Sequence, residues 1–174
     1  MPSVPTDALE RAQRFVDLHA GDELFVMANP TTTGIAQLFE QLGYQALGTS
    51  SAALARSLGR SDGERALSRA EAIDHAKDLA AATTVPISGD FENGYGDDPR
   101  AVAETIRAAI QAGLAGCCIE DATGRADEPI YEPSLAAERI AAGAEAMGDN
   151  PFVLVARAEN FLHGRKDLVD TIAR

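Results

Sequence analysis

Several kinds of residue and segment are scarce in this sequence, and each scarcity excludes a class of protein. The 174 residues include no tryptophan, two cysteines and 5% aromatic side chains. The cysteines, Cys117 and Cys118, are adjacent and do not have the spacing of a zinc site. Because neighbours on a strand point to opposite faces, we expect them to stay unpaired, as small buried apolar residues.

Basic residues are in the minority. The chain has 15 lysines and arginines against 27 aspartates and glutamates, a formal net charge of −12. This balance argues against nucleic acid and anionic membrane surfaces as partners. No apolar run approaches the roughly 18 residues of a membrane span. Residues 1–6 have no basic start followed by an apolar stretch, so no signal peptide is expected. We therefore expect a cytoplasmic protein.

Short apolar segments alternate with helical patterns along the whole chain. The segments are apolar on both faces, as parallel strands covered on both sides are. One domain over residues 1–174 is expected, of the α/β class, either a (β/α) barrel or an open doubly wound sheet. No standard dinucleotide or phosphate loop is present. The expected strands are 24–28, 45–48, 85–88, 115–119 and 152–156, and the expected helices are 7–19, 33–42, 69–82, 98–113, 133–148 and 164–174.

A polar residue follows each expected strand. In a parallel α/β fold the carboxyl ends of the strands lie on one side, where ligands bind in barrels and open sheets alike. One such residue alone is ordinary loop polarity, but five coincident ends favour a site. They are Asn29, Thr49-Ser50-Ser51, Asp90 with Glu92, Glu120-Asp121, and Arg157 with Glu159.

These residues have the chemistry of a cation site. Asp90 and Glu92 project the same way if the backbone stays extended between them, and Glu120 comes from the next strand. Oxygen ligands without imidazole or thiolate suit Mg²⁺ or Mn²⁺ rather than zinc. Arg157 is expected to pair with a substrate carboxylate or phosphonate. His163 is a weaker candidate, better explained as an ordinary loop histidine.

Four motifs occur in an order that matches a known family. They are "LFEQLGYQALGTSSAALARSLGRSD" (38–62), "VPISGDFENGYGD" (85–97), "AGLAGCCIEDATG" (112–124) and "FVLVARAENF" (152–161). Together they resemble the isocitrate lyase/phosphoenolpyruvate mutase superfamily, most of all its phosphonomutase-like branch, which includes carboxyvinyl-carboxyphosphonate phosphorylmutase. The resemblance covers most of the chain from about residue 24 onward.

The resemblance implies a (β/α)8 TIM barrel with a Mg²⁺ site at its carboxyl-terminal face. It further implies an enzyme that cleaves or forms a C–C or P–C bond beside an enolisable 2-oxo acid carbonyl, while the metal stabilises the enolate. By motif, Asp90, Glu92 and Glu120 would hold the metal directly or through water. Arg157, Thr49, Ser50 and Ser51 would bind the substrate, with Arg157, Thr49 and Ser50 acting in catalysis. Asp62 matches a further acid of the site.

Two departures from the family pattern bear on function. The lyases carry a lysine-cysteine-glycine-histidine loop after the fourth strand, and the phosphonate enzymes carry lysine and asparagine there. This chain has neither between Asp121 and Tyr131, so the substrate is left open. A full barrel needs about 250 residues, so we expect a barrel truncated after about five strand-helix units. Full-length relatives suggest a homo-oligomer. The alternative function is a catalytically silent fragment that binds a metal or carboxylate.

Overall fold

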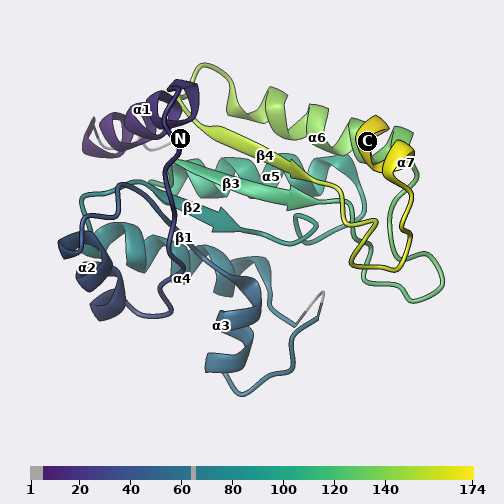
Figure 1. The fold of residues 1–174 in the computed structure, drawn as a ribbon, viewed down its shortest axis with the longest axis horizontal. Helices are drawn as coiled ribbons and strands as arrows, with labels where there is room; N and C mark the ends of the chain where they lie inside the picture. The colour runs from purple at the N-terminus through teal and green to yellow at the C-terminus, as the bar shows by residue number, and fades with distance from the viewer. Residues whose placement is uncertain (1–5, 64–65) are drawn as a thin grey trace.

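A parallel sheet of four strands forms the centre of the molecule. The computed structural model describes residues 6–63 and 66–174. Within them the strands lie in sequential order, and every neighbouring pair is parallel (Figure 1). The strands are β1 (Leu47–Gly48), β2 (Ile87–Asp90), β3 (Gly116–Glu120) and β4 (Val153–Arg157).

Helices precede, connect and follow the strands. They are α1 (Thr6–Ala20), α2 (Thr33–Gln41), α3 (Ser51–Ser57), α4 (Arg69–Ala82), α5 (Pro99–Gln111), α6 (Pro133–Met147) and α7 (Leu168–Ala173). Ser68 and Glu71 form a capping box at the start of α4, and Asp98 caps α5. The sequence patterns did not predict α3, and α7 begins four residues later than expected.

The strand order distinguishes between the two α/β architectures that the sequence left open. A parallel crossover connection is almost always right-handed. When each strand lies beside the previous one in the same direction, the crossover helices α4, α5 and α6 therefore fall on one face of the sheet (Figure 1). A doubly wound sheet would need a reversal of strand order. The described sheet is thus an arc of a (β/α) barrel, and the fold class is confirmed.

The expected first strand, 24–28, is wrong over most of its length. Only Ala28 pairs with the sheet, through a single parallel bridge to Leu47. Leu24 is fully exposed and Val26 largely so. No further strand lies beside this segment among the described residues. Phe25 instead packs on α1, where its ring meets His19 at a centroid distance of 5.0 Å. Packing against a helix has replaced strand pairing for this apolar segment.

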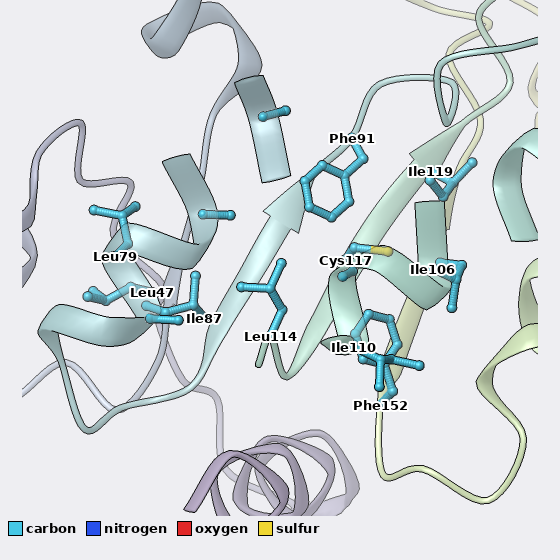
Figure 2. Packing of buried hydrophobic residues seen from close by; sticks show 14 of the residues in the cluster. Leu47, Leu79, Ile87, Phe91, Ile106, Ile110, Leu114, Cys117, Ile119 and Phe152 are labelled. Carbon is cyan, nitrogen blue, oxygen red and sulfur yellow. The ribbon is translucent and has the colours of Figure 1, made fainter. Parts of the chain in front are cut away.

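The amino ends of the strands are sealed by apolar packing. Phe15 of α1 is buried and packs with Ala46 and Ala115, which precede β1 and β3. A Cβ atom at Gly116 would lie 2.6 Å from the Val153 carbonyl oxygen and 2.7 Å from the Phe15 ring, so only glycine fits there. The main core continues between the sheet and α4 and α5 (Figure 2).

The carboxyl ends carry the charged residues. The observed strands begin one or two residues later than predicted, and β2, β3 and β4 also end one or two residues later, whereas β1 ends at Gly48 as predicted. As a result β2 ends on Asp90, β3 on Glu120 and β4 on Arg157. These side chains are therefore fixed by strand hydrogen bonding and not by loops.

Among the described residues, no helix is long and apolar enough to cross a membrane.

Candidate active site

A cavity of about 630 Å³ opens at the carboxyl ends of the four strands. All residues that the family resemblance assigned to the site line this one cavity, whereas Asp121, which also follows an expected strand, does not. The assigned residues are Thr49, Ser50, Ser51, Asp62, Asp90, Glu92, Glu120 and Arg157. The tertiary structure thus brings the predicted set together, while the role of each residue stays a prediction.

Asp90 is held by the turn that follows β1. The backbone N–H and the hydroxyl of Ser51 both donate to Asp90 Oδ2, each at 2.8 Å. The Asp90 N–H donates in turn to the Thr49 hydroxyl oxygen at 2.7 Å. Ser50 accepts a hydrogen bond from the Ala53 N–H and caps α3. In this structure the turn fixes the position of a carboxylate, a use that the sequence analysis did not foresee.

The guanidinium of Arg157 lies among three carboxylates. Its Nη1 is 3.3 Å from Asp90 Oδ1, and its Nη2 is 3.3 Å from Glu120 Oε2 and 2.6 Å from Glu159 Oε1. Although burial disfavours the charged guanidinium, contact with Cys118 and attraction to Glu120 and Glu159 raise the pKa of Arg157. Arg157 is therefore a permanent positive charge that offsets part of the acidic cluster.

Glu120 differs from an ordinary surface acid. Burial raises its pKa to about 7, against the opposing effect of Arg157, and the charges of Glu159, Asp90 and Glu92 raise it further. A carboxyl group in this environment is partly protonated near neutral pH. Glu120 can consequently hold or release a proton at the cavity wall.

The backbone conformation at Glu92 differs from the one predicted. The sequence argument assumed an extended backbone from Asp90 to Glu92, and that assumption is wrong because Glu92 has φ 47°. Its side chain nevertheless lines the cavity and is buried. Asp62 lies at a more exposed position, where it pairs with Arg56 at 3.3 Å.

Cys118 is a cavity residue that was not selected for the site from the sequence. Cys118 donates from its thiol to Asp90 Oδ1 at 3.5 Å, and burial, with the nearby Asp90 charge, raises its pKa to about 11. Glu159 contacts Arg157, and Asn29 and His163 also line the cavity. Strand alternation could have identified Cys118, because it lies two residues before Glu120 and shares its face. Cys117 points into the core, and both cysteines are free, as expected.

The acids of the cavity have donor atoms that suit a hard divalent cation. In the structure, however, their side chains are not arranged around one ion position. Asp90, Glu92, Glu120 and Glu159 supply only oxygen atoms, the donors that Mg²⁺ and Mn²⁺ prefer. In the described part of the chain, no three histidine, cysteine, aspartate or glutamate side chains converge as a ready-made metal site. Arg157 stands between three of these acids instead.

The fold and cavity define a class of protein, namely a parallel α/β barrel-type chain with an acidic pocket at its strand ends. Comparison with known proteins narrows this class. The sequence model of the phosphoenolpyruvate phosphomutase family matches residues 15–174. The chain belongs to this family, and its named relatives include lyases and mutases.

Three similar proteins show the range of these relatives. A crystal structure of a candidate lyase/mutase from Burkholderia cenocepacia J2315 is 47% identical, with a TM-score of 0.92, over 97% of this chain and 60% of that one. An uncharacterized Mycobacterium tuberculosis H37Rv protein is 35% identical over 92% of this chain and 58% of its own. The 2-methylisocitrate lyase of Escherichia coli K12 is 33% identical over 71% of this chain and 44% of its own. The chain therefore spans about three fifths of the first two proteins.

Proposed function

We propose that the chain forms the metal- and carboxylate-binding part of a Mg²⁺-dependent enzyme of the lyase or phosphonomutase type. The substrate would be a small 2-oxo or 2-hydroxy carboxylate, or a phosphonate. The reaction would cleave or form a C–C or P–C bond next to an enolisable carbonyl. One observation carries this proposal: five acids and Arg157 share a single cavity at the carboxyl ends of a parallel sheet.

The cation is assigned to Asp90, Glu92 and Glu120, whose donor chemistry suits it. When bound, it would supply Lewis-acid stabilisation of a developing enolate oxyanion. Ser51 and Thr49 keep Asp90 in place through the hydrogen bonds described above. Because metal ligands must be deprotonated, Glu120 would lose its proton on metal binding.

Arg157 has the chemistry to bind the substrate carboxylate. A planar guanidinium binds carboxylates and phosphonates with two parallel hydrogen bonds. In the structure Arg157 contacts the protein's own acids. A substrate anion would compete with those acids, so substrate binding and rearrangement of the acidic cluster are expected to be coupled.

Isothermal titration with Mg²⁺ and oxalate, a mimic of the pyruvate enolate, tests the proposal. We expect oxalate to bind when Mg²⁺ is present and to bind much more weakly without it. Absence of binding of either ligand would contradict the enzyme hypothesis. Binding without turnover of oxaloacetate, 2-methylisocitrate or phosphonopyruvate by a full-length protein would favour the silent binding fragment instead.

A further inference from the structure

Arg139 is the largest fully buried side chain of the described residues, with 1% exposure. It extends from α6, in the outer helical layer, toward the loop that follows β2. Its Nη1 donates to the carbonyl oxygen atoms of Gly96, at 2.6 Å, and Asp97, and its Nη2 donates to that of Asn93. Three backbone carbonyls of one five-residue segment are thus held by one guanidinium.

The backbone in and next to this segment, residues 93–97, has unfavourable φ angles. The segment begins directly after Glu92 and contains Tyr95, and both residues have positive φ values, 47° and 64°. Non-glycine residues are strained in this region, and such strain persists only where the surroundings hold it. The Glu92 carbonyl accepts from the Glu120 N–H at 2.9 Å on the sheet side. Arg139 supplies the contacts on the opposite, helical side.

Arg139 also contacts the loop that follows β3. Its guanidinium lies over the Tyr131 ring at 4.2 Å from the centroid. The Tyr131 hydroxyl donates to Asp97 at 2.7 Å and accepts from the Asn93 side chain at 3.1 Å. Arg125, in the same loop, pairs with Asp97 at 2.8 Å. Asp97 therefore joins the loop that follows β2 to the loop that follows β3.

We propose that Arg139 is a positioning residue that fixes Glu92 at the cavity, by clamping residues 93–97 and joining them to the loop of residues 121–131. The inference rests on the proposed function in one respect, namely that Glu92 acts as a metal ligand. Arg139 does not line the cavity itself. Its effect on a bound ion must therefore pass through the loop, and this requirement makes the proposal testable.

The test is a double-mutant cycle with Mn²⁺ as the probe. Arg139→Met removes the guanidinium, and Glu92→Gln removes the carboxylate that it is said to position. We expect Arg139→Met to weaken Mn²⁺ binding about tenfold in the wild-type background and not at all in the Glu92→Gln background, because residues that act through one another are not additive. An equal loss in both backgrounds would overturn the proposal, since it would indicate general destabilisation.

Hydrogen exchange of the metal-free protein gives a second readout. Arg139→Met should accelerate amide exchange in residues 93–98 and 121–131, with β3 and β4 unchanged. Ile140→Ala, on the same helix and packed against the core, is the matched control and should spare both loops. Unchanged exchange of residues 93–98 in Arg139→Met would overturn the clamp.

If Arg139→Met does not fold, Arg139→Lys is the second variant for the same two measurements. A lysine retains the charge but lacks the planar fork that reaches several carbonyls, so the same changes are expected at smaller size. Failure of the wild-type protein to bind Mn²⁺ would overturn the proposed function and the metal role of Glu92. The exchange experiment would then still decide whether Arg139 holds the loop.

Discussion

The two ends of the same strands differ sharply in chemistry. At the amino ends, Phe15 packs against Ala115 and the Gly116 backbone in a buried apolar cluster. At the carboxyl ends, only four residues further along β3, Glu120 faces a charged cavity. Because parallel strands share one direction, every strand contributes its apolar start to one end and its polar finish to the other. We therefore expect that stability and ligand binding can be perturbed separately in this chain.

The largest expected effect lies at the amino end. Phe15→Ala should lower the free energy of unfolding by about 3–5 kcal/mol, because it removes a fully buried ring and leaves a cavity. Urea unfolding measures this loss. The affinity of the folded protein for Mn²⁺ should stay unchanged, because Phe15 packs at the amino ends of the strands and does not line the cavity.

Leu24→Ala is the control for Phe15→Ala, because Leu24 is fully exposed. It should change the free energy of unfolding by no more than about 0.5 kcal/mol. A cost below about 1 kcal/mol for Phe15→Ala would contradict the assignment of the amino end as the stabilising region.

Asp90→Asn should have the next largest effect, at the carboxyl end. The neutral amide can still accept hydrogen bonds from Ser51, so we expect little loss of stability. Mn²⁺ binding should weaken about 100-fold, which corresponds to about 2.7 kcal/mol. Calorimetric titration is the measurement, and Asp62→Asn, at a more exposed position of the same cavity, is the matched control.

An unchanged Mn²⁺ affinity in Asp90→Asn would remove Asp90 from the ligand set. Unfolding of the variant would instead show that the hydrogen bonds from Ser51 need a charged acceptor, and the carboxyl end would then contribute to stability after all.

A smaller effect is expected from pH. Burial raises the pKa of Glu120 to about 7 from its ordinary value of 4.5. The folded state therefore binds the proton more tightly than the unfolded state between these two values. By linkage, the stabilisation from protonated Glu120 is present below about pH 4.5 and is lost as pH rises through 7.

Urea unfolding of metal-free protein at a series of pH values tests this sign. The free energy of unfolding should fall between pH 5 and 8 more steeply in the wild-type protein than in Glu120→Gln. The difference between the two proteins isolates the contribution of Glu120 from those of the other titratable groups. Identical slopes would show that burial does not perturb this carboxyl group.

The smallest expected effect is at a helix start outside both regions. Ser68→Ala removes the hydroxyl that accepts from the Glu71 N–H in the capping box of α4. It should cost about 1 kcal/mol of stability, with no change in Mn²⁺ binding. Ser134→Ala, at an exposed position near the start of α6, is the control, and thermal unfolding compares the two. An equal effect of both changes would show that the cap contributes nothing.

Much of the architecture could be predicted from local patterns. Apolar segments, the caps at Ser68 and Asp98 and the proline at 133 define most strands and helices, because these signals act within a few residues. The segment 24–28 is an exception. Its composition favours a strand, but pairing needs a neighbour, and the helix α1 offered Phe25 a better contact.

The sequence by itself determined which residues stand at the carboxyl ends of the strands, since strand alternation and strand direction are local properties. It could not determine that Arg157 would sit among Asp90, Glu120 and Glu159, because that contact spans up to 67 positions of the chain. Nor could the sequence identify Arg139 as a positioning residue. Only the packing of α6 beside the loop that follows β2 distinguishes Arg139 from other arginines on helices. Contacts between distant segments depend on how helices and strands pack, and packing is a property of the whole fold.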